Sequence, residues 1–177
     1  MDRNRICVEG DSRLSLVDNA TAARVAALID ALAAAGETVA VAESLTGGLV
    51  CSTLVHPAGA SRVVVGGVVV YSTDVKASVL GVDEGLLAER GAVDPAVALQ
   101  MATRVRSKFG STIGVATTGV AGPDSQDGIA VGTVFVALVS DRIETVEECH
   151  FTGTRDEIRL AAVNAAITLL ENSLRTE

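Results

Sequence analysis

The chain has 177 residues, of which 49% are hydrophobic, so it is long and apolar enough to fold as one domain with a buried core. Its formal net charge is −8 and only 2% of its residues are aromatic. Such a surface repels a phosphate backbone and offers no stacking platform for bases, which argues against general binding of DNA or RNA.

Other features narrow the class of protein. Residues 1–17 are weakly patterned, and we expect a tail or arm there, followed by a single domain over residues 18–177. The chain start lacks the apolar stretch of a secretory signal, and no apolar run is long enough to cross a membrane, so we expect a cytoplasmic protein. The three Cys and two His have neither disulfide nor zinc spacing, so we expect no metal and no redox cofactor.

The first half of the chain predicts two helices and two strands. A helix is expected from Thr21 to Ala35, ended by Gly36, because apolar side chains recur there at helical spacing: Val25, Leu28, Ile29 and Leu32. A buried strand at Thr38–Ala42 leads through a polar turn into a helix that ends near His56. The apolar run Val63–Tyr71 predicts a strand covered on both faces, in the middle of a sheet. Its Gly66-Gly67 pair predicts a bulge or a close backbone approach.

The second half of the chain predicts a run of helices, then three strands and a final helix. Ser72-Thr73-Asp74 can cap a short helix carrying Lys76, and further helices are expected at Leu86-Leu87 and Ala96–Phe109. Strands are expected at Thr112–Thr118, Gly132–Val139 and Thr145–Phe151. The last helix starts near Arg155, with a predicted apolar face of Leu160, Val163, Ile167, Leu170 and Leu174. Early alternation of helix and strand, with two strands pairing late, predicts an α/β fold: a three-layer α/β/α sandwich with a mixed sheet.

The segment Ala42–Gly48 connects a strand end to a helix start through a small polar turn. Ligands of α/β sheets bind at the carboxyl ends of strands, and N–H groups at a helix start can hold a phosphate or an oxyanion. Gly47 and Gly48 let another group approach the backbone closely. Ser44 could be a nucleophile, but the motif alone favours a simpler interpretation, in which Ser44 or Thr46 caps the helix.

A second segment could supply a base. Tyr71, the only tyrosine, ends the most apolar strand, and Lys76 lies about one helical turn later. A desolvated lysine can lose its proton, and a Ser-Lys pair is an established form of activated serine. Asp74 would raise the pKa of a neighbouring lysine, but two residues away on a helix it is expected to cap the helix or face solvent. The alternative is a solvated lysine, and the segment alone does not decide between them.

Two more segments could bind an anion. The loop Thr117–Asp124 follows an apolar strand and is rich in small residues, so its N–H groups could surround a phosphate or a carboxamide; it could equally be a plain turn. Arg155 and Arg159 share a helix face and could clamp a phosphate. For Arg159, ordinary pairing with Asp156 is the favoured interpretation.

In this order along the chain, the segments resemble the CinA C-terminal domain family, the nicotinamide-nucleotide amidohydrolases. The resemblance covers Thr21 to Leu174. The residues that carry it are Ala42–Gly48, Ala58–Ser61, Gly67–Ser72 with Lys76, Gly91–Val93, Thr118–Pro123, Val131–Val134 and Arg155.

The resemblance implies an enzyme that hydrolyses the carboxamide of nicotinamide mononucleotide, giving nicotinate mononucleotide and ammonia. It implies Ser44 as nucleophile, with Tyr71 and Lys76 as its partners. We expect Lys76 to act as the base and Tyr71 to orient Ser44 or relay the proton. N–H groups near residues 46–48 would stabilise the oxyanion. Substrate binding is expected from Thr46, Gly47, Gly48, Thr118, Gly119, Gly122 and Arg155. We further expect no cofactor, a small-molecule nucleotide substrate, no nucleic-acid or membrane partner, and a homo-oligomer.

The chain also departs from the family pattern. Where the family often has Cys, Asn and a glycine-rich stretch, this chain has Leu45, Thr73 and Asp124–Gly128. Leu45 excludes a cysteine nucleophile in that turn, and the altered loop changes the substrate contacts expected from it. The family domain often follows a larger domain, and we expect a stand-alone version here. The alternative function is a non-catalytic nucleotide-binding or interaction module linked to competence or DNA damage, which would not need an activated Lys76.

Overall fold

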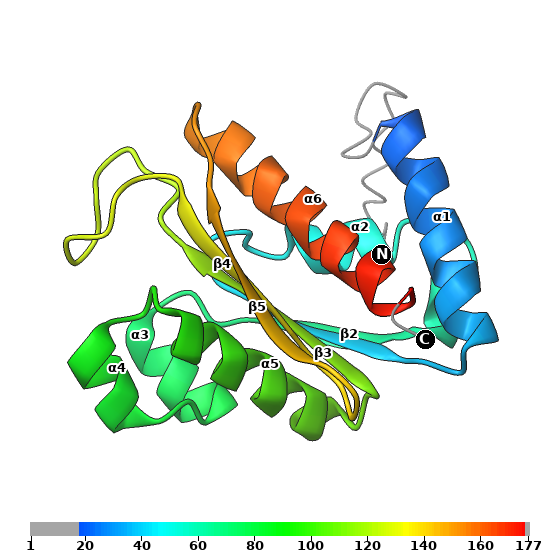
Figure 1. Cartoon of the computed structure of the whole chain (residues 1–177), viewed down its shortest axis with the longest axis horizontal. Coiled ribbons are helices and arrows are strands. Elements are labelled where there is room, and N and C mark those ends of the chain that lie inside the picture. The colour runs from blue at the N-terminus through cyan, green and yellow to red at the C-terminus, as the bar shows by residue number, and fades with distance from the viewer. Residues whose placement is uncertain (1–17, 176–177) are drawn as a thin grey trace, which may run out of the picture.

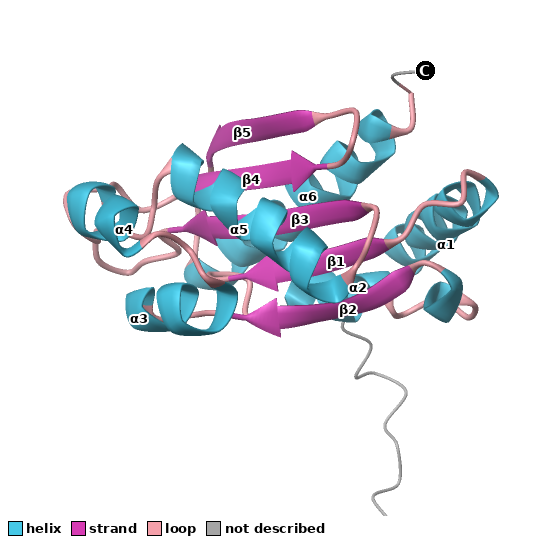
Figure 2. Cartoon of the chain, turned by 90° about the horizontal axis from the view of Figure 1, so that it is seen from below, coloured by secondary structure: helices cyan, strands magenta, loops and turns pink. Residues whose placement is uncertain are grey.

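The fold is built on one mixed sheet of five strands. The computed structural model describes residues 18–175, so the arm expected at residues 1–17 lies outside the described residues. The strands lie side by side in the order β2-β1-β3-β4-β5 (Figure 2). Strands β2, β1 and β3 are parallel, whereas β4 pairs antiparallel with both β3 and β5. Their bounds are β1 Val39–Glu43, β2 Val64–Val69, β3 Ile113–Gly119, β4 Thr133–Val139 and β5 Glu144–His150.

Helices cover both faces of the sheet and confirm the predicted three layers. In Figure 1, one face carries α1 (Asn19–Ala34), α2 (Leu49–Leu54) and α6 (Arg155–Ser173). The opposite face carries α3 (Thr73–Val75), α4 (Glu84–Arg90) and α5 (Pro95–Phe109). Two short turns complete the order, Ala60–Arg62 and the π-helical turn Lys76–Leu80 that continues α3. Each face of the sheet has its own apolar cluster, because the strand side chains alternate between them.

The helix periodicities are confirmed in α1 and corrected in α6. The buried residues of α1 are the four predicted ones, Val25, Leu28, Ile29 and Leu32. In α6, Leu160 is wrongly placed in the predicted face, since it is 50% exposed. Val163, Ile167 and Leu170 are buried as predicted, and the same face also includes Ile158, Ala162 and Ala166. Leu160, two residues after Ile158, therefore points away from the sheet, and the prediction missed the small alanines that share the buried face.

The prediction that Val63–Tyr71 lies in the middle of the sheet is wrong. Strand β2 is an edge strand that pairs only with β1, and its residues alternate between half-buried and exposed. Strand order is set by the whole topology, so an apolar run does not report it. The predicted irregularity at Gly66 is confirmed: the β1–β2 register shifts there, and a Cβ on Gly66 would lie 2.9 Å from the Phe109 ring.

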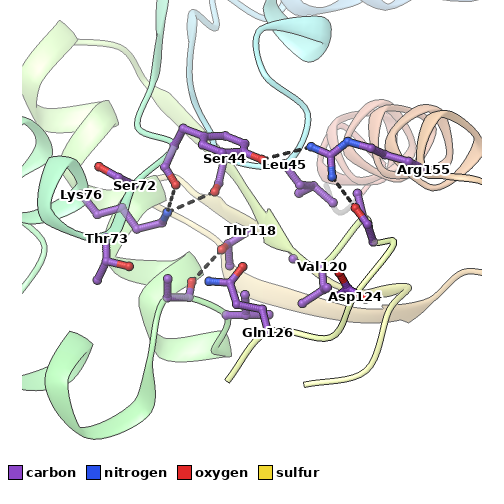
Figure 3. A pocket seen from close by; sticks show the side chains of 16 residues that line it. Ser44, Leu45, Ser72, Thr73, Lys76, Thr118, Val120, Asp124, Gln126 and Arg155 are labelled. Atoms are coloured by element: carbon purple, nitrogen blue, oxygen red, sulfur yellow. Dashed lines mark hydrogen bonds between the residues drawn. The ribbon is translucent and has the colours of Figure 1, made fainter. Parts of the chain in front are cut away.

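The parallel part of the sheet determines where the functional segments meet. Strands β1, β2 and β3 are parallel, so the segments that follow them gather at one edge of the sheet, the one formed by the carboxyl ends of these strands. These segments begin at Ser44, Val70 and Val120, and the N-terminus of α6 lies at the same edge (Figure 3). No helix within residues 18–175 combines the length and the apolar character needed to cross a membrane.

Candidate active site

A pocket of about 360 Å³ opens at this edge of the sheet. Its wall is formed by the segments after β1, β2 and β3, by the loop before α5, and by the start of α6 (Figure 3). The lining residues are Ser44, Leu45, Tyr71, Ser72, Thr73, Lys76, Ala92, Val93, Thr118, Gly119, Val120, Ala121, Gly122, Asp124, Gln126 and Arg155. The pocket thus collects residues from all four segments singled out in the sequence.

Ser44 lies at the carboxyl end of β1 with its hydroxyl directed at Lys76. Its N–H donates to the Thr117 carbonyl at 3.0 Å, which anchors the start of the turn to β3. Its Oγ lies 3.1 Å from the Lys76 Nζ, and the residue is 7% exposed. The interpretation of Ser44 or Thr46 as a helix cap is wrong, because Gly48 occupies the N-cap of α2 and the Thr46 hydroxyl bonds to that of Thr117.

Lys76 is buried, which excludes the solvated lysine. It is 1% exposed, and besides Ser44 Oγ its Nζ contacts the carbonyl oxygens of Val70 and Tyr71, at 3.0 and 3.2 Å. Burial lowers the Lys76 pKa from 10.5 to about 8. Asp74 is exposed, as expected for a residue on another helix face.

The three contacts of Lys76 also fix the direction of its lone pair. A neutral amine has two N–H donors and one lone pair. The two carbonyl oxygens can only accept, so they take both N–H groups. The lone pair is then left facing the Ser44 hydroxyl, which can donate to it. In the neutral state, Lys76 is therefore arranged to receive the Ser44 proton.

Tyr71 contributes at two points of the pocket. Its backbone carbonyl accepts from Lys76, as described above, and its hydroxyl accepts from Arg155 at 3.0 Å. Within residues 18–175 that hydroxyl makes no hydrogen bond to Ser44 or Lys76. The carbonyl thus orients the amine, and a proton relay through the hydroxyl stays a prediction.

Arg155 is the cation of the pocket. Its guanidinium donates to the Gly122 carbonyl at 2.6 Å and to the Tyr71 hydroxyl, so it ties the start of α6 to the loop after β3. Two of its five N–H groups suffice for these contacts, which leaves others for an anion. On the opposite wall, the Thr118 hydroxyl donates to the Ala92 carbonyl at 2.6 Å and holds the loop before α5 against β3.

The turn after Ser44 differs from the prediction. Thr46, Gly47 and Gly48 are not part of the pocket wall in the described structure, where this turn contributes only Ser44 and Leu45. The Gly47 N–H donates to the Ser44 carbonyl at 3.1 Å, and the Gly48 N–H donates to the Glu43 carboxylate at 2.9 Å. These two N–H groups are therefore engaged and cannot stabilise an oxyanion.

Two N–H groups of the same turn remain for that role. Among residues 18–175, no hydrogen bond is made by the N–H of Leu45 or of Thr46. Leu45 directly follows Ser44 and lines the pocket. The N–H of the residue after a serine nucleophile is a common member of an oxyanion hole.

Arg159 acts on the turn rather than in the pocket. The expected pairing with Asp156 is confirmed, at 3.3 Å. Its other nitrogens donate to the carbonyls of Leu45, at 3.0 Å, and Thr46, at 3.2 Å. Spacing along α6 gave no sign of this contact, because Leu45 is 114 positions away in the sequence.

Comparison with known proteins now identifies the family. Residues 21–174 match the family model described as CinA C-terminal domain. The chain belongs to the CinA C-terminal domain family.

Similar proteins carry names of the same kind. A CinA-like protein of Frankia casuarinae is 48% identical over 137 residues, and a putative competence-damage inducible protein of Desulforamulus reducens is 48% identical over 141. These matches cover 77% and 80% of this chain but 32% and 34% of the relatives, so the chain spans about a third of their length. The crystal structure of competence/damage inducible protein CihA from Agrobacterium tumefaciens is 34% identical, with a TM-score of 0.86, covering 92% of this chain and all of that one.

The structure adds pocket residues to which the sequence had given no role. Ala92 and Val93, which stood inside a quoted motif, form one wall, and Asp124 and Gln126 project from the loop that departs from the family pattern. Glu43 stood inside a quoted motif but was given no role; an acidic residue just before a helix start was the available signal. Within residues 18–175, no group of three or more His, Cys, Asp or Glu side chains is placed to hold a metal ion.

Proposed function

We propose that this CinA-family domain hydrolyses the carboxamide of nicotinamide mononucleotide, producing nicotinate mononucleotide and ammonia. The observation that carries the proposal is the 3.1 Å contact between Ser44 Oγ and the Nζ of a lysine that is 1% exposed. A serine with a buried amine as its base is suited to acyl transfer, and amide hydrolysis is one such reaction. The resemblance to the nicotinamide-nucleotide amidohydrolases supplies the substrate class.

The first half-reaction forms an acyl-enzyme. Neutral Lys76 accepts the Ser44 proton as Ser44 Oγ attacks the carboxamide carbon, and the carbonyl oxygen becomes an oxyanion. The Leu45 N–H is the donor we assign to that oxyanion. The C–N bond then breaks, Lys76 returns its proton to the leaving nitrogen, and ammonia departs.

The second half-reaction releases the acid. Lys76, neutral again, takes a proton from a water molecule while the water oxygen attacks the ester carbon of the acyl-Ser44 intermediate. Collapse of the second tetrahedral species breaks the C–O bond, and Ser44 Oγ recovers a proton from Lys76. The product leaves as the acid, which releases its remaining proton to solvent, so the products are the nicotinate carboxylate and the regenerated enzyme, and no redox step is involved.

Arg155 is the group we assign to the phosphate of the nucleotide. It is the only Lys or Arg besides Lys76 in the pocket wall of the described residues. The chain carries a formal charge of −8, so a local cation is needed for a phosphorylated substrate to be attracted to this mouth. Thr118, Gly119 and Gly122 also line the pocket, and we assign them as a small-residue surface for the ribose phosphate.

The rival function is a non-catalytic nucleotide-binding or interaction module. Such a module would gain nothing from burying a lysine amine beside a serine hydroxyl, because burial of a charged amine costs stability. Ammonia release from nicotinamide mononucleotide by the purified protein tests the choice. Turnover by the wild type and none by Ser44→Ala supports the enzyme. Tight binding of the nucleotide without ammonia release would support the module.

A further inference from the structure

Glu43 is a buried charged side chain that the proposed mechanism does not use. It is 1% exposed, and its carboxylate accepts N–H groups of Gly48 at 2.9 Å, Val50 at 3.1 Å and Cys51 at 2.8 Å. Both carboxylate oxygens are engaged, and the negative charge sits at the N-terminus of α2, where the helix dipole favours it. Glu43 therefore fills the place that a substrate anion could otherwise take.

Arg159 holds the same turn from the side of α6. Its Nε and one terminal nitrogen donate to two successive carbonyls, those of Leu45 and Thr46. The same terminal nitrogen would lie 3.4 Å from a Cβ placed on Gly47, so it packs directly over the turn. Because peptide units are planar, fixing these carbonyls also fixes the directions of the N–H groups of Thr46 and Gly47.

The turn at residues 44–48 depends on contacts from outside it to hold one conformation. Gly47 and Gly48 both have positive φ, 61° and 97°, a region open to glycine but loosely determined by glycine alone. Its start is tied to β3 by the Ser44 N–H and by the Thr46 hydroxyl, which both bond to Thr117. After Ser44, the backbone hydrogen bonds of the turn within residues 18–175 are short-range ones, such as that from Gly47 to Ser44. Glu43 holds the end of the turn through nearby N–H groups, and Arg159 adds a restraint from a distant segment.

We infer that Glu43 and Arg159 form a brace that holds the turn at residues 44–48 in the one conformation that aims Ser44 Oγ at Lys76. Both act as positioning residues for the nucleophile, and neither touches the substrate. The inference rests on the proposed role of Ser44. It also assigns the phosphate away from the α2 N-terminus, because Glu43 already occupies the N–H groups there.

Two conservative variants separate positioning from folding. Glu43→Gln keeps one acceptor oxygen and replaces the other by an amide that opposes an N–H. Arg159→Lys keeps the charge but cannot hold two carbonyls as a fork. Because misplacement of a reacting group by about 1 Å costs about 100-fold, we expect kcat to fall about 10- to 100-fold in each. KM and the pH midpoint should stay unchanged, since Arg155 and the burial of Lys76 are untouched.

Asp156→Asn is the matched control for Arg159. Asp156 contacts the same guanidinium at 3.3 Å but is 83% exposed and does not reach the turn, so its loss should leave kcat unchanged. Arg159→Met should have a lower kcat than Arg159→Lys, because a lysine at this position can still donate to one of the two carbonyls and a methionine cannot. Variants that lose thermal stability but keep wild-type kcat below their melting temperature would reduce the brace to a merely structural contact and overturn the inference.

Labelling of Ser44 by a fluorophosphonate, followed by mass spectrometry, tests the brace without any nucleotide. We expect wild-type Ser44 to be labelled and Glu43→Gln and Arg159→Lys to be labelled at least about 10-fold more slowly. Equal labelling rates would overturn the brace while leaving Ser44 as nucleophile. No labelling of the wild type would remove the nucleophile and the brace together. If Glu43→Gln does not fold, the partly exposed Arg159 carries the test through Arg159→Lys.

Discussion

The fraction of Lys76 that is unprotonated sets the rate of the proposed reaction, and the pKa of the buried amine determines that fraction. Burial lowers its pKa from 10.5 to about 8. At neutral pH about one amine in ten is then neutral, which is about 300 times the fraction of a free lysine. We expect kcat/KM to rise tenfold for each pH unit below this pKa and to level off above it.

The same shift predicts a pH dependence of stability. Below about pH 8 the amine is charged in the folded and in the unfolded chain, and keeping it buried costs about 3 kcal/mol of folding free energy. Between about pH 8 and pH 10.5 the unfolded chain keeps the Lys76 proton and the folded chain loses it, so the free energy of unfolding rises with pH in that window. In Lys76→Met, which keeps the apolar stem, this rise should be absent.

The assay is initial-rate ammonia release at nicotinamide mononucleotide concentrations well below KM, across the range from about pH 6 to pH 10, with far-UV circular dichroism to verify folding. Lys76→Met should lose about 100- to 10,000-fold in kcat/KM, the usual contribution of a general base. Lys76→Arg should be equally inactive, because guanidinium cannot accept a proton. A flat pH profile in a folded wild type, or substantial activity in Lys76→Arg, would refute the base role.

Four further outcomes are expected. Ser44→Ala should fold normally and lose about 10³-fold or more in turnover; near-normal turnover would exclude it as nucleophile. Arg155→Ala should raise KM by about 10- to 100-fold with little change in kcat, and less for the phosphate-free nucleoside; equal losses would mark Arg155 as structural. Exhaustive chelation should leave turnover unchanged, whereas loss restored by zinc or magnesium would contradict the Ser-Lys scheme. Gly114→Ala should lower the free energy of unfolding, measured by chemical denaturation, by about 3 kcal/mol, because the added Cβ would lie 2.1 Å from the Ala102 carbonyl oxygen. The control Gly110→Ala, where a Cβ meets open space, should cost only about 1 kcal/mol. Equal costs would disprove the close contact at Gly114.

Much of the fold followed from local pattern. Apolar spacing located α1 and its buried face, because periodicity reports which side chains of one segment point the same way. Pairing of the last two strands was also predictable, since neighbouring strands with a short connection pair readily. The face of α6 was predictable only in part: Val163, Ile167 and Leu170 are buried as expected, but the alanines of that face carry little hydrophobic signal and were missed.

The sequence also determined which residue types were present for chemistry. It offered a serine after one apolar strand, a lysine after another, and an arginine at a helix start, and it excluded clusters of metal ligands with familiar spacing. For Ser44 and Lys76, however, the sequence alone left a helix cap and a solvated lysine as open alternatives. Local pattern cannot choose between them, because the choice depends on what covers each side chain.

Tertiary structure decided that choice. Ser44 and Lys76 are 32 positions apart, and they meet only because parallel pairing brings the ends of β1 and β2 to one edge of the sheet. The contact of the amine with Ser44 and the contacts of Arg159 with the turn both join distant segments. Such contacts depend on strand order and on which helix covers which face, and these are properties of the whole packed chain rather than of any segment within it.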